Sequence, residues 1–495
     1  MLNSALKRLT LAVSLAVAAT GCATVGTDFK APAAVADASF RHLPQAGDYA
    51  ASNAAHLPAQ WWTVFGDATL NRLEETALRD NPSVKAAAQR LLQALEQAGV
   101  TRAAEQPQLS VNAGISNSRT SAETSQGLAL GHRSIKGNNY AVGSSFSYEI
   151  DLLGRVRRLV EAADAQALAA AADRDGVLLV LSSQLATTYW QLRGMDAELA
   201  ILKGALDTRR ETEELVTARF DAGLSNELDV SRARIERANA QADLHEVQRQ
   251  RNLLEHSLAT LVGASPSAML TAANADAAVL PQPPAIPVGL PASVLAQRPD
   301  LAGSVATLRA TNAQIGVAEG AFYPSFSLTG NFGFASESLS NLAKGDARQF
   351  SVGPLALSLP IFDGGRNKAN LAIAKARYEE AVANHQTKLL TALREVEDAL
   401  SDVQQRQMQG EAQQASQVAA ARAYLVARAR YERGVSTYLD VTDAQRSSLA
   451  ADRAAVQINT QRLLAAVSVA RALGAGWQPS AQLSQVAQNG AIKTQ

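Results

Sequence analysis

The apolar positions of this chain follow two periods, one typical of helices and one typical of strands. A helical pattern begins near Asp67 and runs to about Ala104, with Asn81-Pro82 marking a break. The period then falls to two, which is typical of a strand with one apolar face. The apolar positions here are Leu109, Val111, Ala113 and Ile115, followed by Tyr140, Val142, Phe146, Tyr148, Ile150 and Leu152. These two runs predict a β-hairpin within residues 108–152.

A second hairpin is expected within residues 325–360, where the alternation returns. Its first strand carries Phe326, Leu328, Phe332 and Phe334. In its second strand the alternation changes phase at Pro354, which predicts a β-bulge. Each predicted strand has about ten residues, the length of a tilted strand that crosses a membrane.

A very long helix is predicted after each hairpin, over residues 155–220 and 365–432. In the first, apolar residues recur at spacings of three and four, which predicts a left-handed coiled-coil seam. The seam positions include Leu181, Leu185, Leu192, Met195, Leu199, Leu202, Leu206, Val216 and Phe220. Each long helix ends at a turn, and a returning helix then covers residues 225–262 or 436–473. Gly223 and Gly434 suit the left-handed residue of these turns, and Ser225 and Ser436 are the expected caps of the returning helices.

The chain is an internal duplication. Residues 81–111 align without a gap onto residues 298–328, and the turns and returning helices recur at a slightly shorter offset, which predicts a longer loop in the first hairpin. A period this long indicates a doubled half-protein and excludes a solenoid of short repeats. We expect a first repeat over 67–280, a Pro-rich strap over 281–297, a second repeat over 298–474 and a polar tail over 475–495.

Four strands in one chain cannot close a barrel, and an open sheet in lipid would leave its edge groups unpaired. Each unpaired backbone group costs several kcal/mol in lipid, so closure is required there. Three chains that each donate four strands would form a 12-stranded barrel, an even number within the known range. The predicted fold class is therefore mainly α with membrane β, in a trimer. A water-facing sheet in a soluble domain would show the same alternation.

Composition narrows the range of functions. The chain has 46 basic and 46 acidic residues, a balance that argues against a nucleic-acid partner. His245-Glu246 begins a metalloprotease-like pattern, but Arg249 stands where the second ligand belongs. The six histidines are scattered, and no Gly-rich phosphate loop lies between a strand and a helix. We expect no enzyme, no catalytic or metal site, and no cofactor apart from a covalent lipid.

Residues 1–21 have the layout of a lipoprotein signal peptide. Lys7-Arg8 precedes a short apolar stretch, and Ala19-Thr20-Gly21 leads into Cys22. Small residues before a cysteine resemble the bacterial lipoprotein cleavage box, which makes Cys22 the lipidated first residue of an arm over residues 22–66. An ordinary signal peptide followed by a chance cysteine is the alternative.

The chain resembles the outer-membrane efflux protein family, in its lipoprotein branch. The residues that carry the resemblance are Tyr323-Pro324-Ser325-Phe326, Arg430-Tyr431-Glu432-Arg433-Gly434-Val435 and Tyr438-Leu439-Asp440-Val441-Thr442-Asp443-Ala444-Gln445-Arg446. The resemblance implies a homotrimeric channel whose barrel stands on a long coiled-coil α-helical tunnel, in the outer membrane of a Gram-negative bacterium. It implies a duct for small molecules that works with a periplasmic adaptor and an inner-membrane efflux transporter. A non-conducting periplasmic adaptor and a coiled-coil envelope lipoprotein are the alternatives.

The resemblance also implies a gate at the periplasmic helix tips. Asp440 and Asp443 match the family's paired gate aspartates, and Tyr431 matches a gate tyrosine. In the first repeat, Asp229 occupies the place of Asp440 and Arg232 that of Asp443. A carboxylate in the first turn of a helix also stabilises the helix dipole, so Asp440 has a structural interpretation as well. Our hypothesis is that Asp443 is a gate carboxylate and that Arg232 is a partner that holds neighbouring helices closed.

The turns between the paired helices are, by the same resemblance, the places where the adaptor docks. They read Gly223-Leu224-Ser225 in the first repeat and Gly434-Val435-Ser436 in the second. Ordinary capping of the helix ends is the other interpretation, and both roles can hold together.

Overall fold

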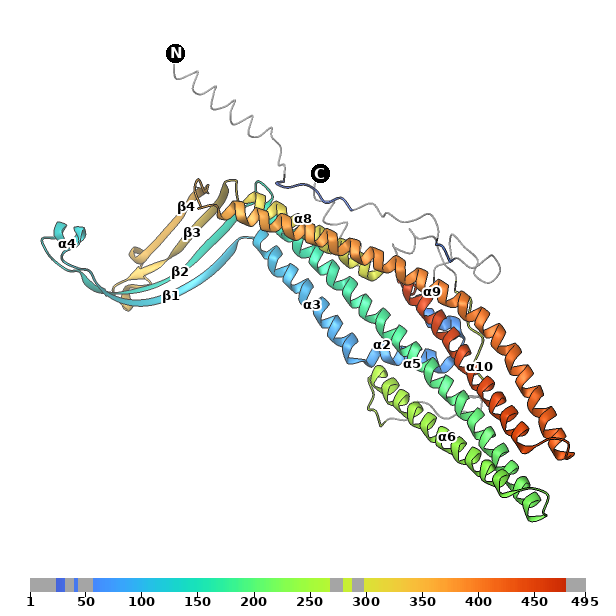
Figure 1. Cartoon of the computed structure of the whole chain (residues 1–495). Helices are drawn as coiled ribbons and strands as arrows, with labels where there is room; N and C mark the ends of the chain where they lie inside the picture. The colour runs from blue at the N-terminus through green and yellow to red at the C-terminus, as the bar shows by residue number, and fades with distance from the viewer. Residues whose placement is uncertain (1–23, 32–39, 43–56, 268–278, 287–297, 478–495) are drawn as a thin grey trace.

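The structure, a computed structural model, describes residues 24–31, 40–42, 57–267, 279–286 and 298–477. It is a long bundle of helices with a β-sheet at one end (Figure 1). The first repeat holds η1 Trp61–Phe65, α2 Ala68–Asp80, α3 Pro82–Arg102, η2 Ala103–Glu105, β1 Gln108–Arg119, α4 Ser125–Ala129, β2 Lys136–Ile150, α5 Arg155–Asp221 and α6 Glu227–Val262. The second holds α8 Pro299–Gly320, β3 Ser325–Ser336, η4 Leu339–Asn341, η5 Gly345–Ala347, β4 Arg348–Ser358, α9 Arg366–Glu432 and α10 Tyr438–Ala472.

The break expected at Asn81-Pro82 separates α2 from α3. The Oδ1 of Asn81 accepts a hydrogen bond from the Ser83 backbone N–H at 2.7 Å, and Pro82 occupies the first turn, where its missing N–H costs nothing. The side-chain amide of Asn81 also donates to the Leu261 carbonyl at 2.7 Å. One residue thus ends α2, caps α3 and fixes both to the end of α6.

The four strands form one antiparallel sheet in the order β1-β2-β3-β4. Leu328 pairs with Leu355 but Gly330 pairs with Val352, so β4 carries an extra residue at this point. Gly353 has φ +96°, which glycine adopts without strain, and this is the bulge that the phase change predicted. Within the described part of the chain, β1 and β4 each pair on one side only, so the sheet has two open edges.

The core of the body lies around the middle of α5. Leu185, Tyr189, Trp190 and Leu192 are fully buried there, as the coiled-coil seam predicted for the leucines. The short turn η1 packs on this part of α5, where the Trp61 indole N–H donates to the Ser182 hydroxyl at 3.1 Å.

The part of α5 nearest the sheet has a different core, which the leucine pattern did not reveal. Alanine is the main buried residue here, at Ala162, Ala163, Ala165, Ala167, Ala171 and Ala172. A Cβ added to Gly303 of α8 would meet the Ala172 Cβ at 3.3 Å, so α5 and α8 approach closely. Small side chains permit this approach, but they give a weak hydrophobic signal in a sequence.

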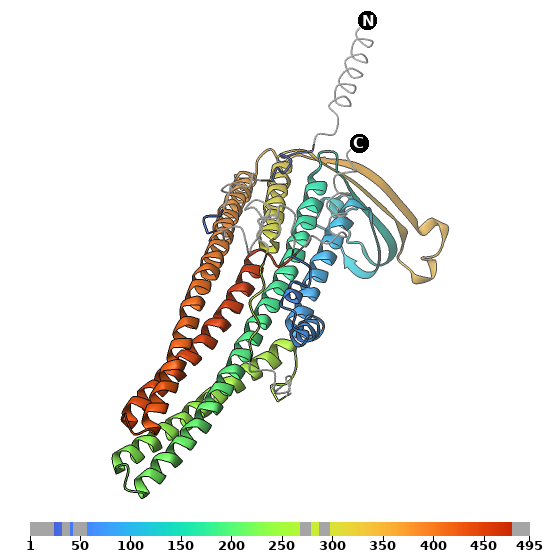
Figure 2. The same ribbon diagram turned by 90° about the vertical axis from the view of Figure 1, so that its right-hand side faces the viewer.

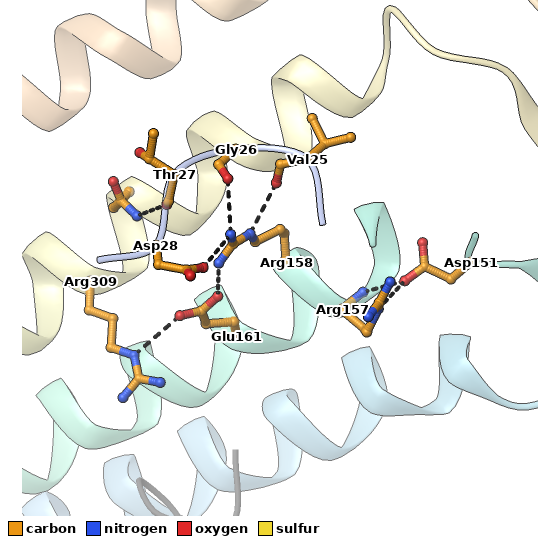
Figure 3. A network of polar contacts seen from close by, with 10 residues as sticks. Val25, Gly26, Thr27, Asp28, Asp151, Arg157, Arg158, Glu161 and Arg309 are labelled. Carbon is orange, nitrogen blue, oxygen red and sulfur yellow. Dashed lines mark hydrogen bonds and ion pairs between the residues drawn. The ribbon is translucent and has the colours of Figure 1, made fainter. Parts of the chain in front are cut away.

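Residues 24–31 of the N-terminal arm are held where the sheet meets the helices (Figure 3). The buried Arg158 guanidinium donates to the carbonyls of Val25 and Gly26, each at 3.1 Å, and pairs with Asp28 and Glu161, each at 2.7 Å. Cys22 itself lies outside the described residues.

The far end of the chain is packed where a polar tail was expected to begin. Ala475 is buried, and the Trp477 indole N–H donates to Asp175 Oδ2 at 2.8 Å. A Cβ at Gly476 would lie 2.3 Å from the Pro58 carbonyl oxygen, so the backbone at Gly476 packs directly against the segment that leads into η1. Residues 478–495 of the tail and 287–297 of the strap lie outside the described residues.

Candidate functional site at the helix tips

The two helix turns lie side by side at the end of the body opposite the sheet (Figures 1 and 2). We call α5 with α6 the first helix pair, and α9 with α10 the second. Their ends share a small apolar cluster that consists of Val216, Val230 and Ala233 from the first pair and Tyr431, Tyr438 and Val441 from the second. The internal duplication therefore brings its two copies into contact at the position where the resemblance places a gate.

The two turns have the same backbone geometry. Gly223 and Gly434 have φ +70° and +74°, the left-handed conformation that glycine favours. The next residue in each turn bonds back across the end of the helix, Leu224 N–H to Arg219 O at 2.8 Å and Val435 N–H to Arg430 O at 3.0 Å. Leu224 and Val435 are 71% and 63% exposed, so each tip presents one aliphatic side chain to the surroundings.

The caps of the returning helices are not the two serines that we expected. Asn226 caps α6 and Thr437 caps α10, each one residue later. Ser225 instead lies with its hydroxyl 3.4 Å from Asp229 Oδ2, and the Ser436 hydroxyl is buried without a partner among the described residues. Serine, threonine and asparagine are all good caps, so a sequence with two of them in succession does not fix which one caps.

Asp229 and Asp440 make the local contacts of capping residues. Asp440 Oδ2 accepts hydrogen bonds from the Thr437 backbone N–H and hydroxyl, both at 3.0 Å. Asp229 accepts a bond from the Asn226 side-chain amide at 3.2 Å. The structural interpretation of Asp440 is therefore supported by direct contacts, and its gate role stays a prediction.

Tyr431 connects the two helix pairs through Arg219, a residue that sequence reasoning missed. The Arg219 guanidinium carbon lies 4.7 Å from the centroid of the Tyr431 ring, and Arg219 Nη1 donates to the Tyr431 carbonyl at 3.1 Å. The Tyr438 ring lies 5.7 Å from that of Tyr431. Burial raises the pKa of both phenols, so both remain neutral at physiological pH.

A buried ionic cluster, which we call the Glu236 cluster, joins the two helix pairs a little further from the tips. It consists of Arg209 from α5, Glu236 from α6 and Arg446 from α10. Glu236 is only 3% exposed, and its Oε1 accepts a hydrogen bond from Arg446 Nε at 2.9 Å. Its Oε2 lies 3.3 Å from Arg209 Nη2, and its backbone carbonyl accepts from Arg209 Nη1 at 3.0 Å. The carboxylate thus lies between two arginines, one from each repeat.

Sequence reasoning did not find this cluster because nothing local marks it. Glu236 and Arg446 are 210 residues apart, and each lies on a helix with many other charged residues. Arg446 does belong to the run that carried the family resemblance, but the partner of a charge that far away is set only by the fold.

Asp443 and Arg232 do not pair with each other within the described protomer. The Asp443 side chain is 64% exposed, and its Oδ1 lies 4.0 Å from Arg446 Nη1 on the same helix. Arg232 Nη1 lies 3.6 Å from Asp229 Oδ1, also on its own helix. Our hypothesis that Arg232 holds Asp443 therefore requires the contact to form between neighbouring copies of the chain.

A second buried ion pair joins the same helices closer to the middle of the body. Arg453 of α10 donates to Glu198 of α5 at 2.8 Å and lies 3.4 Å from Asp243 of α6. Glu198 is 2% exposed. The two repeats are thus joined by ionic contacts at two levels along the bundle.

The described residues contain no group of three or more His, Cys, Asp or Glu side chains that could hold a metal ion. No helix among them has both the length and the apolar character that crossing a membrane requires.

A family model described as outer membrane efflux protein matches residues 73–264 and 290–475 of this chain. The chain belongs to this family. Outer membrane efflux proteins form trimeric channels that work with an adaptor and an inner-membrane pump in tripartite efflux systems. The chain is therefore an outer-membrane efflux channel of a Gram-negative bacterium, it spans the outer membrane into the periplasm, and it is not an enzyme.

Similar proteins support this membership over nearly the full length. The outer membrane protein OprJ of Pseudomonas aeruginosa is 35% identical over 432 residues, which cover 86% of this chain and 87% of that protein. The cation efflux system protein CusC of Escherichia coli is 31% identical and covers 94% and 98%. Among solved structures, the outer-membrane channel OprN is 31% identical with a TM-score of 0.84 and covers 92% of this chain and 100% of that chain.

The family membership confirms the predicted fold class, mainly α with a β part, and excludes the non-conducting adaptor and the envelope scaffold. It also favours the membrane interpretation of the alternating strands over a water-facing sheet.

Proposed function

We propose that this chain forms a passive duct that exports small molecules such as drugs and toxic compounds, and that an adaptor opens it by docking on its helix tips. Similar proteins are named for chemically different cargo, cations for CusC and toluene for TtgF of Pseudomonas putida, so channels of this one family serve different exports. In such a system the inner-membrane transporter selects the cargo.

The observation that carries the opening step is the Glu236 cluster. Glu236 is buried between arginines from the two repeats, so the helix pairs cannot separate without exposing or unpairing a charge. The Arg446 side chain is 55% exposed, so water screens part of its attraction to Glu236, and losing this partner costs less than the roughly 3–5 kcal/mol typical of a fully buried ion pair. The cluster therefore acts as a latch between the helix pairs, and the exposed Leu224 and Val435 offer the adaptor apolar contacts at the same end.

Planar-bilayer recordings of the purified channel test this latch. We expect Arg446→Gln to raise the fraction of time that the channel is open without any adaptor, because Glu236 loses its partner on α10. Arg428→Gln is the matched control, since Arg428 pairs with Glu432 on its own helix at 2.9 Å and, among the described residues, has no ionic partner in the other repeat. An Arg446→Gln channel as closed as the wild type would refute the latch.

We also propose that Asp443 contributes to the gate. Its carboxylate is mostly exposed and has only a long contact with Arg446, so it is available to an aqueous entrance. Three copies would place three such carboxylates around one axis, and together they would repel anions. Asp443→Ala should change the single-channel conductance and reduce the preference for cations. An unchanged conductance would contradict a role of Asp443 in the gate.

The lipid anchor is a further part of the proposal. Cys22 becomes the acylated N-terminus, and the adjoining residues 24–31 are fixed to α5 and α8 at the base of the sheet. Cells fed labelled palmitate should label the wild-type protein and leave Cys22→Ser unlabelled. Label on the Cys22→Ser protein would exclude this cysteine as the attachment site.

A further inference from the structure

The two faces of the β1–β2 ladder differ in chemistry over most of its length. On one face β1 and β2 pair Gln108 with Ser147, Ser110 with Ser145, Asn112 with Gly143, Gly114 with Ala141, Ser116 with Asn139 and Ser118 with Gly137. This face is small, polar and uncharged along the whole ladder, which suits the interior of a channel. The opposite face must then meet the lipid.

The lipid-facing side of the same ladder changes in order along its length. From the helical end outward it pairs Leu109 with Phe146, Val111 with Ser144, Ala113 with Val142, Ile115 with Tyr140, Asn117 with Asn138 and Arg119 with Lys136. The first four pairs are mostly apolar and end at Tyr140, two asparagines joined at 2.7 Å follow, and two cations come last. Apolar, aromatic and polar levels in this order are what a strand shows as it leaves the hydrocarbon of a membrane.

The final pair places two positive charges directly opposite each other. Like charges at opposed positions of neighbouring strands repel, and neither cation has an acidic partner among the described residues. The Arg119 Nε donates to the Ser134 hydroxyl at 3.1 Å, which orients the guanidinium, and its two outer nitrogens have no acceptor in the part of the chain that the structure describes. Both side chains are exposed.

Glu123 and Glu337, two of the acidic side chains at this end, have other neighbours. Glu123 pairs with His132 at 3.3 Å within the loop. The Glu337 carboxylate lies beside Gly137, where an added Cβ would be 2.9 Å from its Oε1, and Gly137 belongs to the polar face. On the lipid-facing side the second hairpin adds another exposed cation, Arg348, at the start of β4.

We infer that Arg119 and Lys136 bind the phosphate groups of a phosphorylated lipid in the outer leaflet of the outer membrane. They lie two lipid-facing pairs beyond Tyr140, about 14 Å along the strand at about 3.4 Å per residue, or about 10 Å along the membrane normal for a strand tilted by about 40°. Tyrosine rings mark the start of the head-group region, so the two cations lie on its outer, polar side, where long side chains reach phosphate groups. A guanidinium fork and an ammonium are suited to a phosphate, and one bound phosphate would remove the repulsion between them. The inference rests on the outer-membrane location and is independent of how the channel opens.

The test is a titration of the full-length trimer in detergent with a fluorescent, diphosphorylated lipid A analogue and with its dephosphorylated form. We expect the wild type to prefer the phosphorylated lipid, and Arg119→Gln/Lys136→Gln to bind it about tenfold to thirtyfold more weakly. The control is Arg72→Gln/Lys85→Gln, which removes the same two kinds of exposed cation from α2 and α3 and should bind like the wild type.

Three results would overturn the inference. One is equal affinity of the wild type for both lipids, and another is a double variant at the sheet that binds like the wild type. The third is full competition by millimolar inorganic phosphate, which would show a site for free anions and not for a lipid. Single-channel conductance of each variant, expected to match the wild type, verifies that the trimer is folded.

Discussion

At the scale of single residues, Glu74 is an ionisable side chain in a fully buried position, where an apolar residue is expected. It lies on α2 with no exposed surface, and neither carboxyl oxygen has a hydrogen-bond partner among the described residues. Burial raises the pKa of Glu74 to about 9, so the group is protonated in the folded protein at neutral pH. The unfolded chain would release this proton near pH 4.5, and folding must therefore take one up.

This uptake makes the folded state less stable as pH rises. The contribution of Glu74 to the free energy of unfolding is complete below about pH 4.5 and falls as pH rises toward the folded pKa of about 9. At pH 7 the free energy of unfolding is lower by about 3 kcal/mol than it would be if Glu74 had the same pKa in both states. Glu74→Gln should match the wild type near pH 4 and unfold at a higher temperature above pH 7, as measured by thermal scans in detergent. Glu75→Gln, an exposed neighbour, should change neither, and a pH-independent difference for Glu74→Gln would contradict the assignment.

Side chains with a local role could be predicted from the sequence, and those with distant partners could not. The glycines of both tips and the break at Asn81-Pro82 follow from rules about single turns. Arg219 and Glu236 act through residues more than 200 positions away, which no local pattern specifies.

At the scale of elements, the best-predicted parts are the ones with a regular period. The strands, the long helices α5 and α9 and the bulge in β4 lie close to the ranges that periodicity indicated. The alanine-rich half of α5 was the least visible, because its packing depends on small side chains and close helix approach. The docking of the N-terminal arm on α5 was also unforeseen, since it depends on carbonyl groups that every residue carries.

Arg158 should decide whether this arm stays in place. It is the main polar link between residues 24–31 and α5, and the Glu161 carboxylate depends on it as well. Arg158→Ala should speed amide hydrogen exchange in residues 24–31 by at least tenfold, because buried carbonyls and a carboxylate lose their donor, at a cost of about 2–4 kcal/mol. Arg157→Ala removes the adjacent, more exposed arginine and should leave exchange in the arm unchanged. Equal exchange in both variants would mean that other contacts hold the arm.

At the scale of the whole molecule, the duplication and the sheet edges together specify the assembly. The described chain leaves β1 and β4 open on one side, and lipid does not tolerate open edges. When three copies join β4 of one to β1 of the next, every strand is hydrogen-bonded on both sides and no edge group is left unpaired. That several copies must join was available from the sequence, because it needs only the number of strands and the nature of the solvent. The number three comes from the family, since two or four copies would also close an even-numbered barrel.

The joined strands should make the trimer resist detergent. An unheated sample from outer-membrane fractions should migrate in SDS gels as a trimer, and a boiled one as a single chain of at most 52.1 kDa. The physical reason is that backbone ladders closed in a ring cannot fray from an edge. A single-chain band without heating would contradict the closed ring.

The Glu236 cluster has a consequence for the way such a ring would respond. Both arginines of the cluster and the carboxylate belong to one chain, so each latch can release without its neighbours. If the proposed latch controls opening, the channel would open in up to three separate events, and entrances with one or two released latches would be states with lifetimes of their own. Recordings from single trimers would show these states as discrete sublevels, whereas an interface shared between chains would open in one concerted step.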